Sequence, residues 1–121
     1  MLICIALFLG ALSISGCSKG PSTDDLIDDL SSGEELDRIK AVRWLQQRTQ
    51  EGEKVVPALI GSLKDTDVDV RWGAAIGLGY FGAEAESAVA ALEEAQHDQD
   101  ARVREAARVA ISRIRAGKND E

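Results

Sequence analysis

The stretch "ALIGSLKDTDVDVRWGAAIGL", residues 58–78, decides the fold because the chain carries two further copies of its pattern. Residues 25–45 and residues 91–111 align with it at an offset of 33 residues in either direction. The positions that align across all three copies are Leu26, Leu59 and Leu92; Arg38, Arg71 and Arg104; Ala41, Ala74 and Ala107; and Leu45, Leu78 and Ile111. A period of this length is typical of a solenoid, in which each repeat buries its apolar face against the next.

Each copy predicts two helices, because its apolar residues fall three and four positions apart instead of alternating. Pro57 is expected in the first turn of a helix, where its missing N–H costs nothing. Asp67 and Asp100 are expected to cap the second helices by accepting hydrogen bonds from free amides. We therefore expect an all-α fold, a short right-handed α-solenoid of about three helix pairs. Its domain is expected at residues 22–116, with units at about 22–52, 53–85 and 86–116, followed by a polar tail at 117–121.

The predicted second helices also resemble a known family of repeats. The segments "DVDVRWGAAIGLG" (67–79) and "DARVREAARVAI" (100–111) share an Asp, a Val-Arg pair and an Ala at the same spacing. This succession resembles the HEAT repeat, in the short form named after phycocyanobilin lyases, and "EELDRIKAVRWL" (34–45) is a degenerate copy. The resemblance extends over nearly all of residues 22–116 and implies stacked helix pairs.

The six residues "GLGYFG", 77–82, fit the Gly-x-Gly-x-x-Gly pattern that is typical of dinucleotide-binding loops. That loop requires a strand before the first glycine and a helix after the last, whereas the preceding "VRWGAAIGL" has helical period. We therefore expect Gly77 and Gly79 late in a helix. Gly82 is expected just past its end, where glycine readily adopts a left-handed backbone conformation.

The N-terminal residues indicate export. The stretch at 2–15, "LICIALFLGALSIS", has no charge but is too short to span a bilayer, which is typical of the apolar part of a signal peptide. The following "ISGC", residues 14–17, resembles the lipobox of bacterial lipoproteins. That resemblance implies cleavage admitted by the small Ser15 and Gly16, and lipid on the thiol of Cys17. An ordinary secretory signal or a buried apolar helix is the alternative.

These residues define the expected N-terminal organisation: a signal peptide at 1–16, and a lipidated cysteine with a short tether at 17–21. The only other cysteine, Cys4, lies inside the signal, so the mature chain has no disulfide and no thiol for catalysis or metal. Ser18 stands where inner-membrane lipoproteins commonly have Asp. We therefore expect the protein in the cell envelope, on the periplasmic face of the outer membrane if the bacterium has two membranes.

Acid and base recur together once per unit. Each arginine of one aligned set lies four residues after an acid, in the pairs Glu34 and Arg38, Asp67 and Arg71, and Asp100 and Arg104. In related repeats such residues form a structural ladder between neighbouring units. We expect the same of Arg38, Asp67, Arg71, Asp100 and Arg104, with a binding site for an anion as the alternative.

Two further candidates for metal binding are weak. The acids of "DTDVD", residues 65–69, have the alternating spacing of the first ligands in a calcium-binding loop. Val70 and Ile76 stand where that loop requires Gly and Glu. His97 is the only histidine, and no second histidine or cysteine lies near it to share a metal. We expect no metal, no cofactor and no catalytic constellation.

A surface is the better candidate for function. Trp72, Ile76 and Tyr80 fall on the side of their predicted helix that faces away from its apolar stripe. The equivalent positions in the neighbouring units include Ile39, Arg43 and Arg113. These six residues are the candidate partner-binding set, because aromatic and arginine side chains anchor many protein interfaces. The alternative is that the aromatic rings fill gaps between adjacent helices.

Charge limits the partner further. The formal net charge of −7 disfavours nucleic acid, which requires a cationic surface. Residues 24–37 carry seven acids and no base, whereas residues 102–118 carry six bases and one acid. These runs can attract head to tail, approach anionic lipid, or simply form the outer faces of end caps. The polar Asp37 and Arg48, at positions that are apolar in the other units, favour an end cap whose outer face meets water.

The sequence thus predicts a membrane-anchored bacterial lipoprotein that binds or assembles a protein partner and is not an enzyme. No small-molecule substrate is indicated. An enzyme or enzyme accessory of the bilin-lyase type is the alternative, suggested only by the name of the repeat. A nucleic-acid reader is a third possibility, which acidity and export both oppose.

Overall fold

The computed structural model describes residues 20–119, and within them the secondary structure is entirely helical. The α-helices and 3₁₀ helices in chain order are α3 (Thr23–Asp29), α4 (Glu35–Leu45), η1 (Thr49–Glu51), α5 (Gly52–Ser62), α6 (Val68–Tyr80), η2 (Gly82–Ala88), α7 (Val89–Ala95) and α8 (Ala101–Asn119). The predicted signal peptide and Cys17 lie outside the described residues.

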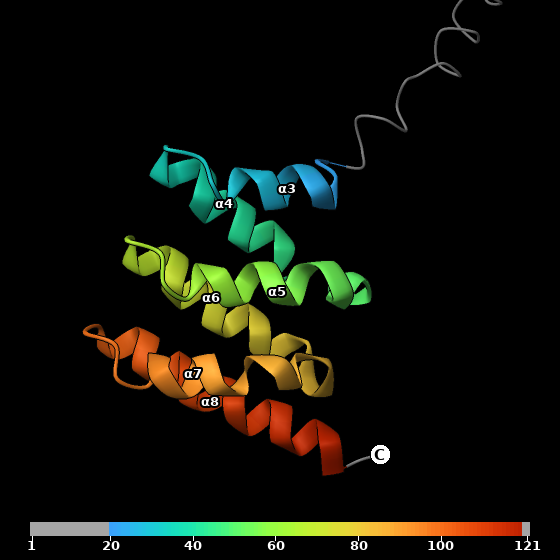
Figure 1. Ribbon diagram of the computed structural model, residues 1–121, viewed down its shortest axis with the longest axis vertical. Coiled ribbons are helices and arrows are strands. Elements are labelled where there is room, and N and C mark those ends of the chain that lie inside the picture. The colour runs from blue at the N-terminus through green and yellow to red at the C-terminus, as the bar shows by residue number, and fades with distance from the viewer. Residues whose placement is uncertain (1–19, 120–121) are drawn as a thin grey trace, which may run out of the picture.

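The helices stack as three layers, each made of a helix pair (Figure 1). The first layer is α3 with α4, the middle layer is α5 with α6, and the third layer is α7 with α8. The second helices α4, α6 and α8 form a row behind α3, α5 and α7, and α6 contacts both α4 and α8. The prediction of a small all-α solenoid is confirmed.

The core repeats from layer to layer in step with the sequence. The first helices contribute Leu26, Leu59 and Leu92, each at most 2% exposed. Between the helices of each pair lie small alanines at the aligned positions, namely Ala41, Ala74 and Ala107, all buried. Burying each leucine contributes about 1.5–3 kcal/mol relative to leaving it exposed, so the repeated leucines hold the layers together.

Glycines let α6 approach both of its neighbours. A Cβ atom on Gly73 would lie 2.7 Å from Cγ1 of Val42, and one on Gly77 would lie 2.8 Å from Cγ of Gln46. On the opposite side, a Cβ atom on Gly79 would lie 3.2 Å from Cα of Ala110 in α8. Larger side chains would force the layers apart, so the glycines serve helix packing.

The segment "GLGYFG" forms the end of α6 and the turn after it. Gly77 and Gly79 lie inside α6, as predicted, and a helix precedes them where a dinucleotide loop requires a strand. The backbone of Gly82 has φ +56°, the left-handed conformation expected where a helix ends. The chain then turns into η2, which leads to the third layer.

The predicted caps of the second helices are confirmed. Oδ1 of Asp67 accepts hydrogen bonds from the amides of Asp69 and Val70, at 2.9 and 3.1 Å. Oδ1 of Asp100 accepts from the amides of Arg102 and Val103, at 2.8 and 3.3 Å. Both carboxylates therefore satisfy amides that have no partner inside the helix.

The prediction for Pro57 is wrong, because α5 begins at Gly52 and Pro57 lies inside the helix. Gly52 is buried, and a Cβ atom on it would collide with the carboxylate of Glu84 and lie 3.4 Å from Cδ1 of Phe81. The helix thus begins earlier than the sequence pattern indicates. Pro57 and Glu53 are exposed, so water can bind the Glu53 carbonyl that proline leaves without a donor.

The boundary of the polar tail also differs from the prediction, because α8 continues to Asn119. Gly117 packs closely on η2: a Cβ atom on it would lie 3.0 Å from the backbone N of Ala83. Nζ of Lys118 lies 3.2 Å from Oε1 of Glu86. These contacts with η2 extend the helix past the last apolar position.

The polar residues of the first layer do not simply face water. Asp37 is half-buried and accepts a hydrogen bond from Oγ of Ser32 at 3.3 Å. Arg48 is half-buried and donates to the carbonyl oxygen of Pro21 at 2.7 Å. They replace apolar residues because the first layer must hold the turn between α3 and α4 and the segment before α3.

Candidate functional site

The arginine ladder connects neighbouring layers. Nε of Arg38 lies 3.0 Å from Oδ2 of Asp65, and Nε of Arg71 lies 2.8 Å from Oδ2 of Asp98. All four side chains are less than a fifth exposed. Each arginine also donates to a carbonyl oxygen of its own layer, Arg38 to Ser32 and Arg71 to Asp65. Each guanidinium thus spans two interhelical turns.

The acids of this ladder are not the predicted ones. Asp67 and Asp100 are occupied as helix caps, and the arginines reach the acids two residues earlier in the following layer, Asp65 and Asp98. The reason is geometric, because a capping carboxylate turns back toward its own helix. Asp65 and Asp98 instead lie at the start of the turn, where they face the preceding layer.

In the ion pair of Arg71 and Asp98, each partner shifts the pKa of the other. The hydrogen bond to Asp98 raises the pKa of Arg71 above its ordinary value, against the effect of burial. Burial alone would raise the pKa of Asp98, but the hydrogen bonds from Arg71 and from the amide of Asp100 outweigh it and lower that pKa. Asp98 is therefore held ionised by its partners.

Arg104 ends the ladder. Its guanidinium donates to the carbonyl oxygens of Asp98 and Gln99, at 2.8 and 3.0 Å. Within residues 20–119 it forms no ion pair. In the preceding layers the acid comes from the layer that follows, and among the described residues no layer follows α8. Arg104 therefore braces its own turn.

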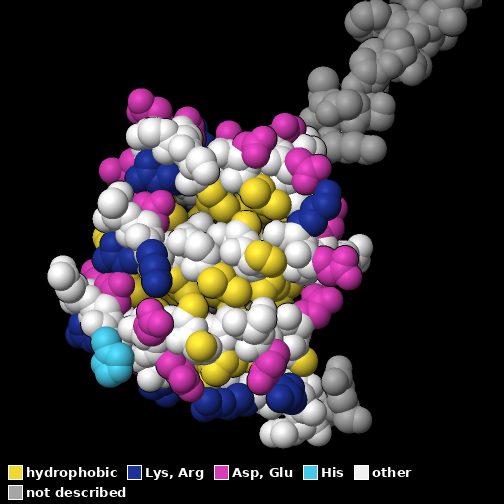
Figure 2. Space-filling model, in the orientation of Figure 1, with side chains coloured by type: hydrophobic (Ala, Val, Ile, Leu, Met, Phe, Trp, Pro, Cys, Tyr) yellow, Lys and Arg dark blue, Asp and Glu magenta, His cyan; other side chains and the backbone are white. Residues whose placement is uncertain are grey.

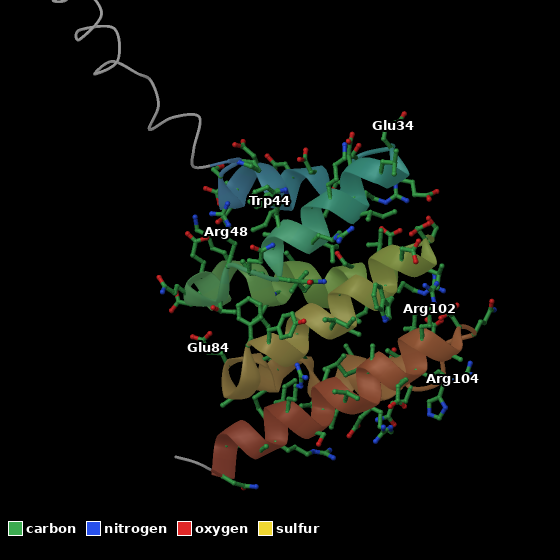
Figure 3. All side chains as sticks on the ribbon, turned by 180° about the vertical axis from the view of Figure 1, so that it is seen from behind. Glu34, Trp44, Arg48, Glu84, Arg102 and Arg104 are labelled. Carbon is green, nitrogen blue, oxygen red and sulfur yellow. The ribbon has the colours of Figure 1, made fainter. Side chains whose placement is uncertain are left out.

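We call Trp72, Ile76 and Tyr80 the α6 stripe; α6 belongs to the row of second helices, which faces the viewer in Figure 3. Trp72 is 38% exposed and Tyr80 is 52% exposed, while Ile76 between them is half-buried. Two arginines of α8 stack on the rings, Arg102 on Trp72 and Arg113 on Tyr80, each 5.7 Å from the ring centroid. The rings thus pack against the next layer and still present surface to solvent.

Two grooves flank this stripe. The first lies between α6 and α8, has a volume of about 560 Å³, and has an apolar floor that includes Ala106 and Val109. The second lies between α4 and α6, has a volume of about 420 Å³, and is lined by Ile39 and Arg43 among others. Trp72, Ile76 and Tyr80 line both grooves, so they form the ridge between them.

The six predicted partner-binding residues are therefore brought together on one side. Trp72, Ile76 and Tyr80 form the ridge, Ile39 and Arg43 line one groove, and Arg113 lines the other. Sequence reasoning missed Arg102 and Ala106, which also line the groove beside α8. A signal was present, because residues 102, 106, 109 and 113 follow one face of a helix.

Charged side chains of both signs line the grooves, the bases Arg43, Arg102 and Arg113 and the acids Asp69 and Glu105. Arg102 pairs with Asp69 of the middle layer at 3.2 Å, which ties α8 to the start of α6. Glu105 pairs with Arg108 on its own helix. Arg43 and Arg113 form no ion pair within the described part of the chain. Arg113 instead stacks on the ring of Tyr80.

The opposite side of the solenoid, formed by α3, α5 and α7, carries no comparable aromatic ridge. Figure 2 shows hydrophobic atoms between the layers there, with acidic side chains gathered at the α3 end and basic side chains at the α8 end. This view agrees with the uneven charge of the sequence. His97 is exposed at an edge of this side.

The remaining candidates have structural partners. Of the acids in "DTDVD", Asp65 pairs with Arg38, Asp67 caps α6 and Asp69 pairs with Arg102. Over residues 20–119, no group of three or more His, Cys, Asp or Glu side chains is placed to hold a metal ion. In the same residues, every helix is too short or too polar to cross a bilayer.

Comparison with known proteins agrees with this architecture. A family model described as HEAT repeats matches residues 23–112, from the start of α3 into α8. No curated protein matches the chain.

Proposed function

The chain belongs to the HEAT-repeat family, and from that premise we propose that it is a protein-binding or assembly module held at a bacterial membrane. HEAT repeats are commonly protein-interaction modules, because stacked helix pairs create an extended surface for a partner. The binding surface proposed for this chain is the α6 stripe with its two flanking grooves.

The exposed ridge of Trp72 and Tyr80 carries this proposal. Tryptophan, tyrosine and arginine are the residues that contribute most of the binding energy in many protein interfaces. Here two aromatic rings are partly exposed on one helix and are held in place by Arg102 and Arg113. A side chain that is already ordered loses less entropy on binding, so this ridge is suited to act as an anchor.

A non-enzymatic role is part of the proposal. The charged groups that recur in each layer are engaged in holding the fold: Arg38 and Arg71 bridge the layers, and Asp67 and Asp100 cap helices. A bilin-lyase type of activity stays an alternative drawn from the resemblance. Incubation of the protein with bilin and an acceptor protein tests it, since covalent transfer would replace the binding role.

The membrane attachment rests on the lipobox-like "ISGC" at residues 14–17, with lipid on Cys17. Stable anchoring requires two or more acyl chains, because one chain binds only reversibly. With Ser18 after the cysteine, we place the protein on the periplasmic face of the outer membrane in a bacterium that has two membranes. Mass spectrometry of the membrane-extracted protein tests the anchor, and equal lipid incorporation in wild type and Cys17→Ala would refute it.

Site-specific photo-cross-linking tests the binding surface. A photoreactive phenylalanine analogue is placed at position 72 or 80, and in a matched control at Ala90, which is exposed on α7 in the other helix row. We expect discrete cross-linked protein bands from positions 72 and 80 and none from position 90. The same bands from all three positions, or none from positions 72 and 80, would contradict the proposed surface.

A further inference from the structure

The end face of the first layer carries an unusual stripe on α4. Leu36, Lys40 and Trp44 follow one another at four-residue spacing, which places them along one side of the helix. We call these three residues the end-face stripe. Leu36 is 66% exposed, Trp44 is 43% exposed and Lys40 is also exposed. A solenoid end that meets only water is expected to be polar, so two large apolar side chains there require an explanation.

The middle layer shows which direction this stripe faces. Gly73 and Gly77 stand at the positions of Lys40 and Trp44 one repeat later, and they press against Val42 and Gln46 of the preceding layer. Lys40 and Trp44 therefore face away from the middle layer. With Lys40 and Trp44 in place of glycines, no helix can approach α4 as closely as α6 does, so a further layer of the same geometry does not fit.

The path of the chain indicates what lies at this face. Gly20 contacts Trp44, since a Cβ atom on Gly20 would lie 3.4 Å from Cη2 of the indole. Gly20 is three residues after Cys17, and three residues reach at most about 11 Å when fully extended. A lipid on Cys17 would therefore hold the bilayer surface beside Trp44.

The side chains around Trp44 have the chemistry of a membrane interface. Tryptophan is enriched at the level of the headgroups, and lysine and arginine extend toward headgroup phosphates. Lys40 and Arg43 flank Trp44 and form no ion pair among residues 20–119. Figure 3 shows Trp44 and Arg48 at the same end of the first layer, with Glu34 at the other end of α4.

We propose that the end-face stripe is a lipid-contacting surface that rests on a phospholipid bilayer. This inference rests on the lipid anchor proposed above for Cys17. The acids at residues 24–37 oppose attraction to anionic lipid, so the contact depends on the indole and Leu36 and suits zwitterionic headgroups. The end face caps the stack at the first layer, whereas the grooves beside α6 open on the side of the stack. A bilayer at the end face therefore leaves the grooves open to a partner.

The two tryptophans of the chain allow a direct test. The full lipidated protein is reconstituted into phosphatidylcholine vesicles whose acyl chains carry bromine, which quenches a nearby indole. Trp72→Phe leaves Trp44 as the only reporter, and Trp44→Phe leaves Trp72. We expect a roughly twofold loss of Trp44 emission and little loss of Trp72 emission, because only the former is at headgroup depth.

The possible results distinguish failure of the lipid anchor on Cys17 from failure of the lipid-contacting stripe. Mass spectrometry of the same samples reports the lipid on Cys17, and circular dichroism reports folding of both variants. Protein without lipid on Cys17 would overturn the anchor and this inference together. Lipidated protein in which both tryptophans are quenched equally, or in which Trp44 is shielded without vesicles by a second copy, would overturn the lipid-contacting stripe alone.

Discussion

The first and middle layers share one helix pattern but differ at two positions of the second helix. In the middle layer, these positions contact the preceding layer. In α6 the contact positions are Gly73 and Gly77, and the backbones approach until no Cβ atom would fit. In α4 the same positions are Lys40 and Trp44, and both side chains are exposed. Side-chain size at these two positions of a second helix therefore decides whether another layer can pack before it, although the helix pattern is the same.

The largest effect is expected from the leucine at the centre of each first helix. Leu59→Ala should lower the free energy of unfolding by about 4 kcal/mol, because Leu59 is fully buried between layers and the cavity cannot collapse easily. Leu26→Ala at the equivalent position should cost about 2 kcal/mol, since α3 is short and can shift at the end of the stack. Urea unfolding measures both. Equal losses would show that the first layer is as constrained as the middle one.

The contact positions themselves give the next largest effect. Gly77→Leu should lower the free energy of unfolding by about 3 kcal/mol, because the new side chain would overlap Gln46 and Leu59. Trp44→Leu is the matched control, and we expect a change of about 0.5 kcal/mol or less at this exposed position. Thermal unfolding followed by circular dichroism compares the two. If Gly77→Leu were as mild as its control, the close approach of α6 to α4 would be disproved.

The two lower arginines of the ladder, Arg71 and Arg104, should differ in their contribution to stability. Arg71→Ala should cost about 2 kcal/mol, because it leaves the largely buried carboxylate of Asp98 without its partner. Arg104→Ala should cost about 0.5 kcal/mol or less, because Arg104 braces only its own turn. Chemical denaturation of both variants measures the difference. A larger loss for Arg104→Ala would mean that the ladder does not carry the stability between layers.

The smallest effect expected is on the pH dependence of stability. Because the pKa of Asp98 is lowered in the folded chain, its contribution is present above its ordinary value of 3.8. That contribution is lost as the pH falls from 3.8 through the lower folded pKa. Between roughly pH 6 and pH 2.5, the free energy of unfolding should therefore decrease more steeply with falling pH for wild type than for Asp98→Asn. Parallel curves would indicate that Asp98 has an ordinary pKa in the folded chain.

The sequence was sufficient for the fold because the repeat fixes the register of every layer. Once Leu26, Leu59 and Leu92 were aligned, the helix pairs and the caps at Asp67 and Asp100 followed from helical spacing alone. These features depend on residues that are close in the sequence, so a single chain reveals them.

The acid partners of the ladder were not predictable in the same way. Asp65 and Asp67 both lie in the turn before α6, and their spacing does not show which one faces Arg38. The choice depends on how the preceding layer is placed. The burial of Gly52 at the start of α5 was missed for the same reason, since its neighbours Glu84 and Phe81 lie far along the chain.

The candidate site was predicted in part. Trp72, Ile76 and Tyr80 were found because they share one helix face, and Arg113 because it occupies the equivalent position one repeat later. The stacking of Arg102 on Trp72 was missed, since Arg102 corresponds in register to Asp69. Its contact with the ring depends on how α8 packs beside α6, which no single-helix projection reveals.

The glycines of α6 also have a consequence for how the molecule folds. Each glycine inside a helix costs about 1 kcal/mol relative to alanine, so α6 by itself is a poor helix former. The helix becomes favourable only when α4 and α8 close upon it, and both then gain contacts with exposed backbone. Formation of the central helix is thus coupled to docking on both sides, so the three layers should fold and melt as a single cooperative unit.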